Sequence, residues 1–299
     1  PAPNQCIVFI NNFLLFFSLL FTTLLLQKKN MDFLLIIFLI TGLFSGFLAG
    51  LLGVGGGIII VPITYFVLLN SGYSKDVIMH VSIATSLGII IFTSISSIRS
   101  HILLRNVDFN IIKKWAPGII VGSIIGSIAA SSINGEVLVH IFVILLFTIS
   151  INMFFQKKII IFSDNIPKSY LLNFLISNTI GFLSVLIGIG GGSFTVPTLS
   201  SFSIGIHKAV GTSAVIGFFI ALPGAISYIF LGRNIAGLPA YSFGYLNIMI
   251  VFLVALSSIF TAHFGAKLSS RINTHSLKKI FAVFLFCTCI SLVVEHFIF

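Results

Sequence analysis

Two glycine-rich stretches contain the residues whose type and spacing favour ligand binding. One is Gly53-Val-Gly-Gly-Gly57 and the other is Gly188-Ile-Gly-Gly-Gly192, and an apolar run restarts directly after each. Glycine is a poor helix former, so both stretches are expected to unwind and to expose backbone N–H groups. The helix that restarts presents free N–H donors and the positive end of its dipole, which together favour an anion. Each stretch is therefore a candidate half-site for a small oxyanion.

Hydroxyl side chains make the two half-sites chemically unequal. Ser193 and Thr195 follow the second stretch, whereas Ile58 and Ile60 stand at the same places after the first. Because a hydroxyl can donate a hydrogen bond to an oxyanion, the second half-site is the preferred substrate contact.

Two Thr-Ser pairs, at 85–86 and 212–213, recur inside long apolar runs. Their hydroxyls are candidates for ligand contact, and the alternative is that they bond their own backbone or a neighbouring helix. The full set of predicted substrate contacts is Gly53, Gly55, Gly56, Gly57, Gly188, Gly190, Gly191, Gly192, Ser193, Thr195, Thr85, Ser86, Thr212 and Ser213.

Close packing is the alternative interpretation of the glycines. Small residues let membrane helices approach one another, and Gly42, Gly46 and Gly50, spaced by four, form a face of this kind. Pro62 and Pro197 fall in the first turns of the runs that follow the glycine stretches, and we expect them to be structural.

Histidines and arginines add two further candidates. His80 and His207 stand near the starts of matching apolar runs. Because imidazole titrates near neutral pH, proton coupling is a candidate role for both, with an interfacial histidine as the alternative. Arg99, His101 and Arg105 form a basic group that either attracts anions or fixes the topology.

Other kinds of chemistry have little support. Only six residues are acidic, which leaves few carboxylates for a metal cage or a catalytic pair, so we expect no metal, no cofactor and no enzyme activity. A nucleotide-binding fingerprint fails, because its third glycine would fall at Ile58 or Ser193. The formal net charge is +10, but the basic residues lie in short gaps between apolar runs. There they act as topology signals, so we expect no nucleic-acid partner.

Composition identifies the elements that position these residues as membrane helices. The 299 residues are 58% hydrophobic and 7% charged, whereas a soluble domain has about 25% charged residues. A spanning helix needs about 20 apolar residues. Runs near that size cover approximately 7–26, 33–52, 76–98, 115–133, 136–155, 170–188, 207–231, 243–264 and 278–298, with shorter runs at 58–69 and 193–204. We predict an all-α polytopic membrane protein.

An internal repeat organises these runs. Residues 46–62 align without gaps with residues 181–197, with ten of 17 positions identical, and 80–86 aligns with 207–213. Each copy has a long helix, a glycine stretch, a short helix and three long helices. The predicted organisation is a first transmembrane repeat over 31–156, a cytoplasmic linker over 157–169 and a second transmembrane repeat over 170–299. Residues 1–30 form a hydrophobic extension, which is an extra helix, an uncleaved signal-like segment or upstream sequence before a start at Met31.

Charge predicts how the two copies are oriented. If each short helix completes a crossing, each copy has five segments and the copies are inverted relative to one another. In that arrangement 12 of the 16 Lys and Arg residues lie on one side and four on the other, as the positive-inside rule favours. The loops 99–114, 156–169 and 265–277 are then cytoplasmic. Inverted repeats with short or interrupted helices are typical of secondary transporters.

Several motifs together match a known family. They are the duplicated Gly-x-Gly-Gly-Gly with Val-Pro at 53–62 and 188–197, the run 207–213, the stretch 101–108 and the stretch 265–271. With them the sequence resembles the sulfite exporter TauE/SafE family over nearly everything from Met31 onward, and it departs from the family pattern at 79–85. The resemblance implies a bacterial inner-membrane permease that moves sulfite, sulfonates or related organic anions, often outward.

Two hypotheses about function remain open. The first is a secondary transporter, an exporter by the resemblance, with a small anionic substrate and the lipid bilayer as partners, acting as a monomer or a homo-oligomer. The second is a membrane scaffold or assembly subunit whose glycines serve helix packing only. The second predicts a closed, dry interface where the repeats meet.

Overall fold

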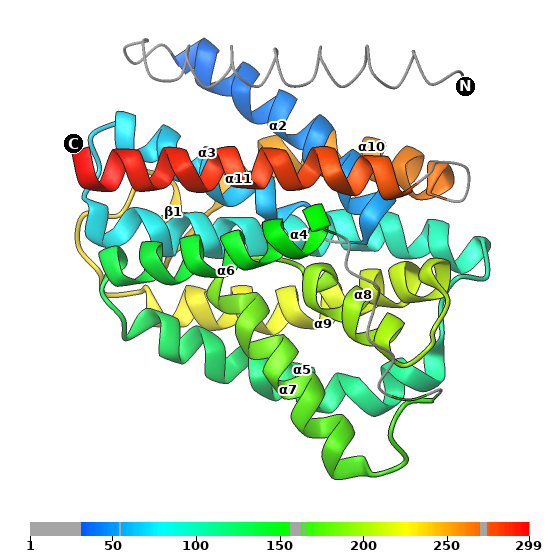
Figure 1. Cartoon of the computed structure of the whole chain (residues 1–299). Helices are drawn as coiled ribbons and strands as arrows, with labels where there is room; N and C mark the ends of the chain where they lie inside the picture. The colour runs from blue at the N-terminus through cyan, green and yellow to red at the C-terminus, as the bar shows by residue number, and fades with distance from the viewer. Residues whose placement is uncertain (1–30, 54, 156–162, 164, 270–273, 299) are drawn as a thin grey trace.

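The computed structural model describes residues 31–53, 55–155, 163, 165–269 and 274–298. The hydrophobic extension over 1–30, with its apolar run 7–26, and most of the predicted linker over 157–169 lie outside the described residues. The described part is almost entirely helical, which confirms the all-α prediction (Figure 1). Most of the long helices run alongside one another.

Ten helices and one hairpin make up the described part of the chain. The helices are α2 (Met31–Leu52), α3 (Gly57–Asn70), α4 (Lys75–Leu103), α5 (Phe109–Ser131), α6 (Gly135–Phe155), α7 (Tyr170–Leu186), α8 (Gly192–Ser201), α9 (Ile206–Leu231), α10 (Ile248–Leu268) and α11 (Thr274–Ile298). The strands β1 (Ser242–Phe243) and β2 (Leu246–Asn247) pair antiparallel before α10. Within the described residues, six helices are long and apolar enough to cross a membrane: α2, α4, α5, α6, α9 and α10.

Local capping explains where helix ends differ from the apolar runs. α5 begins six residues before the predicted run, because the Asp108 side chain accepts backbone hydrogen bonds from its first turn. α10 begins at Ile248 instead of near 243, because the hairpin takes up the preceding residues and Asn247 caps the helix. Asp and Asn are strongly favoured at this capping position.

The long helix predicted over 170–188 is shorter in the structure. α7 has 17 residues and ends at Leu186, two residues before the second glycine stretch. α8 likewise ends at Ser201 instead of 204. Gly188 has a positive φ, which a regular α-helix does not allow, so the glycine stretch limits how far α7 can continue.

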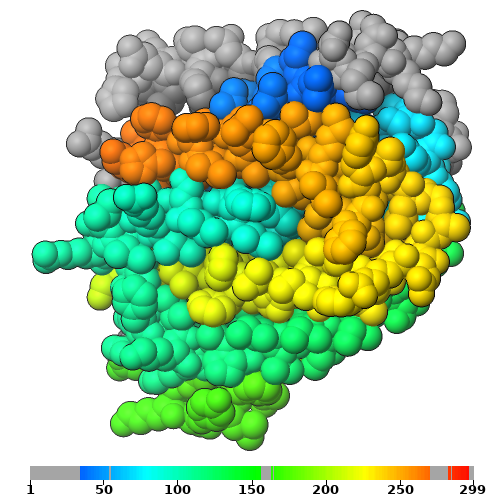
Figure 2. Space-filling view, turned by 180° about the vertical axis from the view of Figure 1, so that it is seen from behind, coloured from blue at the N-terminus to red at the C-terminus, as the bar shows by residue number. Residues whose placement is uncertain are grey.

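Helix contacts follow the two-copy organisation of the sequence. α2 of the first copy packs along α10 of the second, and α5 of the first copy packs along α7 of the second. α4 contacts α10, and its counterpart α9 contacts α5. α6 packs against its own counterpart, α11. α4 and α9 contact each other at the centre. Figure 2 shows α10, α4, α9 and α5 stacked in this order. If each helix is replaced by its counterpart in the other copy, the same set of contacts results. Because these contacts join helices of different copies, the two copies interlock. Their inverted orientation in a membrane stays a prediction.

Glycines allow the closest of these helix contacts. A Cβ on Gly42, Gly46 or Gly50 would overlap the backbone of α10, which confirms the packing face predicted for these three residues. On the matching α5–α7 contact, a Cβ on Gly122 or Gly181 would also overlap the opposite backbone. Small residues therefore set the helix spacing in both copies.

Burial is greatest around α3 and α4. Residues 57–68 of α3 are all buried, and α4 is buried over most of its length. Other helices leave large apolar side chains exposed, as on α6 and α10. Exposed apolar faces are expected for helices that contact lipid. The glycine stretches lie in the buried centre, next to α4 and α9.

Candidate functional site

The two glycine stretches meet each other between the copies. A Cβ on Gly55 would lie 3.0 Å from the Cα of Gly190, and a Cβ on Gly57 would overlap the carbonyl oxygen of Gly188. The two backbones therefore touch, which side chains at these positions would prevent. Segments 135 residues apart in the sequence form one junction.

Each stretch is unwound, and a helix restarts directly after it, as predicted. Gly56 (φ 78°) and Gly191 (φ 77°) adopt the left-handed conformation that favours glycine and are the N-cap residues of α3 and α8. Neither helix start has a side-chain cap. The first N–H groups of a helix have no partner within the helix, so both starts present backbone donors near the junction.

The two Thr-Ser pairs hold the junction together by bonds between the copies. Ser86 Oγ donates to the Gly188 carbonyl at 2.8 Å, and Ser213 Oγ donates to the Gly53 carbonyl at 3.1 Å. These bonds are related by exchange of the copies. Both serine hydroxyls are thus engaged with the backbone of the opposite glycine stretch in this structure.

The threonines of the same pairs also make matching hydrogen bonds in the two copies. Thr85 Oγ1 accepts a hydrogen bond from the Asn247 N–H, and Thr212 Oγ1 accepts one from the Asp108 N–H, each at 3.0 Å. Asn247 and Asp108 are the N-cap residues of α10 and α5. The threonines therefore position the loops that lead into these two helices.

Unpaired hydroxyl groups gather around the second glycine stretch. Ser184 Oγ, Ser193 Oγ and Thr195 Oγ1 are buried and have no hydrogen-bond partner among the described residues. A Cβ on Gly191 would lie 3.5 Å from both Ser184 Oγ and Thr195 Oγ1. Two free hydroxyls thus flank the residue at which α8 begins, beside the backbone donors of the helix start.

Ser184 is not among the residues predicted from the sequence, and the structure adds it to the predicted Ser193 and Thr195. The repeat alignment contains a signal for it, because Ser184 stands opposite Ala49. In the first copy all three matching positions are apolar, namely Ala49, Ile58 and Ile60. The structure therefore adds a third position at which the second half-site has a hydroxyl group and the first has an apolar residue.

Little free space separates the copies at the junction. A narrow hollow is lined by Ala49, Gly53, Gly55, Thr93, Ser94, Ser97, Gly190, Ala214 and Gly217. It leaves no room for a water molecule. The junction is closed in this structure, which fits both a transporter between its open states and a packed scaffold.

The matching histidines have different surroundings. Nδ1 of His80 lies 3.1 Å from the Asp76 carbonyl, and Nε2 lies 3.1 Å from the Ala130 carbonyl. Its ring stacks on Tyr245, with 5.0 Å between ring centres. His207 is exposed at the start of α9. His80 therefore links α4 to α5 and the hairpin, and the two histidines are not equivalent sites.

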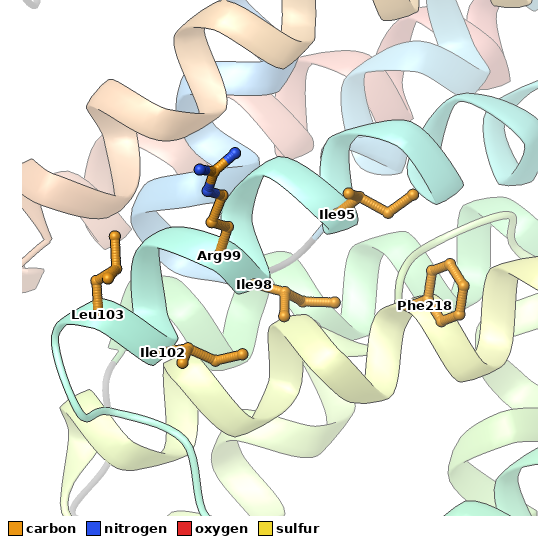
Figure 3. Close-up of a pocket in the computed structure, with 6 residues that line it drawn as sticks. All are labelled: Ile95, Ile98, Arg99, Ile102, Leu103 and Phe218. Carbon is orange, nitrogen blue, oxygen red and sulfur yellow. The ribbon is translucent and has the colours of Figure 1, made fainter.

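Two members of the predicted basic group lie on different faces of α4, and the third, Arg105, follows the helix. Arg99 is exposed and lines an open groove of about 350 Å³ with Ile95, Ile98, Ile102, Leu103 and Phe218. Figure 3 shows its guanidinium pointing away from Ile98 and Ile102. His101 is fully buried, and its Nε2 lies 3.1 Å from the Gly50 carbonyl. The side chains of Arg99 and His101 therefore do not face a common cavity or groove.

Comparison with protein families identifies the family of the chain. The family model for sulfite exporter TauE/SafE matches residues 38–292. The chain belongs to the sulfite exporter TauE/SafE family. With six candidate spans in the described residues, this TauE/SafE protein is a multi-pass transporter of the inner membrane.

Curated relatives match this TauE/SafE chain over most of its length. A probable membrane transporter protein of Haemophilus influenzae is 31% identical over 256 residues, which cover 85% of this chain and 96% of the relative. One of Bacillus subtilis is 30% identical, covering 80% and 88%. One of Methanocaldococcus jannaschii is 30% identical, covering 84% and 93%. No solved structure gives a significant match.

Proposed function

We propose that the protein is a secondary transporter, and an exporter, of a small oxyanion such as sulfite, a sulfonate or a related organic anion. The anion binds where α8 begins. The observation that carries the proposal is the pair of unpaired buried hydroxyls, Ser184 Oγ and Thr195 Oγ1, beside Gly191 at an uncapped helix start.

The donors at this position suit an oxyanion. Backbone N–H groups at a helix start and the positive end of the helix dipole favour negative charge. Hydroxyl groups donate to the same oxygens. An unpaired buried polar group costs about 1–3 kcal/mol, and a bound anion would remove that cost for Ser184 and Thr195. A buried lysine or arginine is therefore not needed to attract the anion.

The proposal requires a movement at the junction between the copies. In the proposal the two copies are inverted repeats that rock against each other about the bound anion. The hydrogen bonds of Ser86 with Gly188 and of Ser213 with Gly53 cross between the copies. Each serine donates only one hydrogen bond to the opposite glycine stretch, so these hydrogen bonds can break and re-form as the junction opens.

Flux measurement in proteoliposomes tests the function. Sulfite, thiosulfate, sulfoacetate, taurine and acetate are offered with and without a pH gradient. We expect at least one sulfur oxyanion to move, and Thr195→Val to reduce its flux at least tenfold. Thr198→Val is the matched control on the same helix, because Thr198 Oγ1 already donates to the Phe194 carbonyl at 2.7 Å.

The alternative for the glycine stretches is helix packing without anion binding. The closed junction is the observation that favours it, because no water molecule fits between the copies there. Folded protein that moves none of the offered anions would contradict the proposed substrate class. Normal flux in the Thr195→Val variant would contradict the α8 site while leaving transport itself in place.

A further inference from the structure

Polar side chains line one buried face of α4 toward its C-terminal end. They are Thr93, Ser94, Ser97, Ser100 and His101, spaced by three or four residues, which places them on one side of the helix. None is more than 3% exposed. Buried polar groups at membrane depth are costly, and they mark substrate pathways when they face the inside of the bundle.

One end of this polar face reaches the glycine junction. Thr93, Ser94 and Ser97 line the hollow between the two glycine stretches. Thr93 Oγ1 lies 3.5 Å from the Gly55 carbonyl, and a Cβ on Gly217 would lie 3.6 Å from Ser94 Oγ. The face is therefore continuous with the backbone of the candidate site.

The other end of the face is at His101. Because the Gly50 carbonyl can only accept, the Nε2 atom that contacts it at 3.1 Å carries the proton. Nδ1 of His101 is buried and has no hydrogen-bond partner among the described residues. Ser97 Oγ, one helical turn away, is also buried and unpartnered within the described part of the chain.

The second copy matches this face only in part. The positions of α9 that match residues 93, 94, 97, 100 and 101 are Ile220, Ala221, Gly224, Ser227 and Tyr228. The first three, which match the end at the junction, carry no polar side-chain group, whereas Tyr228 is buried with its hydroxyl unpartnered among the described residues. The polar groups that line the junction are therefore a property of the first copy alone, and they begin a face that leads toward the C-terminal end of α4.

We propose that the anion passes between the α8 site and the cytoplasmic side along this face of α4, in contact with Ser97 and His101. This route rests on the proposed transport function, and it is the part of the transport path between the α8 site and the cytoplasm. Ser97 Oγ donates to an anion oxygen. His101 Nδ1 accepts from an O–H group, either of a protonated oxyanion or of the water that accompanies the anion. The route ends at the turn between α4 and α5, residues 104–108, which lies within the segment 99–114 that the charge distribution predicts to be cytoplasmic.

Cysteine labelling tests the route. Ser94→Cys and Ser97→Cys are made in a background with Cys6, Cys287 and Cys289 replaced by alanine, and a membrane-impermeant maleimide is added to inside-out or right-side-out vesicles. The matched control is Ser123→Cys, because Ser123 is an equally buried serine on α5 that bonds the Ile119 carbonyl at 2.8 Å.

We expect residues 94 and 97 to react at least tenfold faster than residue 123 in inside-out vesicles, and sulfoacetate to slow the reaction at least threefold. Reaction no faster than that of residue 123, or only from the outer side, would overturn the route even if anion flux is normal. Fast inner labelling in a protein that moves no anion would keep the route and contradict the proposed substrate.

Discussion

Gly191 combines a strained backbone conformation with a crowded position. Its φ is 77°, and a Cβ there would overlap Cδ1 of Ile220. An L residue in this conformation costs roughly 1–3 kcal/mol, and the overlap adds only the cost of shifting the end of the Ile220 side chain. We expect Gly191→Ala to lower the melting temperature of the detergent-solubilised protein.

Gly237→Ala separates the two contributions. Gly237 has nearly the same φ, 76°, but nothing lies within 4 Å of a Cβ placed there. This variant should show the conformational cost alone and therefore a smaller loss of melting temperature. Equal losses in the two variants would contradict the packing assigned to Gly191.

Single residues of the site could be predicted where the repeat marks them. The glycines, Ser193 and Thr195 stand out because two copies can be compared position by position. Ser184 lies four residues before the second stretch, and its relevance depends on how the unwound backbone returns toward α7. Only the fold shows that its hydroxyl lies as close to Gly191 as that of Thr195.

At the scale of elements, Asp108 holds the start of α5. Its Oδ1 accepts from the Asn110 N–H at 3.0 Å, and its own N–H donates to Thr212. We expect Asp108→Ala to lower the free energy of unfolding by about 1 kcal/mol, the usual cost of losing a cap.

Asp108→Asn is the control for this prediction, because asparagine caps a helix as well as aspartate does. Denaturant unfolding of both variants in detergent measures the difference. If the asparagine variant loses as much stability as the alanine variant, the charge of Asp108 matters and the cap does not.

Helix identity could be predicted from apolar runs, but several helix ends could not. A run of hydrophobic residues indicates where the chain can contact lipid or the protein core. It does not show that Asp108 starts α5 before its apolar part or that a hairpin delays α10 to Ile248. Those ends depend on local hydrogen bonds, which composition does not reveal.

At the scale of the whole molecule, the central prediction about topology is that the copies are inverted. Cysteines placed in the turn after α4, at Leu104, and in the loop after α9, at Gly237, occupy matching places in the two copies. Inversion predicts that an impermeant reagent reaches Leu104→Cys from the cytoplasmic side and Gly237→Cys from the outer side. Reaction of both from one side would contradict inversion.

The repeat indicates two matching units but not how they are assembled. In the structure Gly55 and Gly190 touch, although the predicted topology assigned the two stretches to opposite sides of the membrane. The interlocking of the copies, with α2 against α10 and α5 against α7, was not predictable. Apolar patterns do not specify which helix of the other copy covers each face.

Equilibrium binding of sulfite and of sulfoacetate to the purified protein, measured by titration calorimetry, tests the anion site at the start of α8. We expect saturable binding of at least one of these anions, at least tenfold weaker in the double variant Ser184→Ala/Thr195→Val. The control variant Thr198→Val should bind as the unmodified protein does. Equal affinity in all three proteins would contradict an anion site at the start of α8.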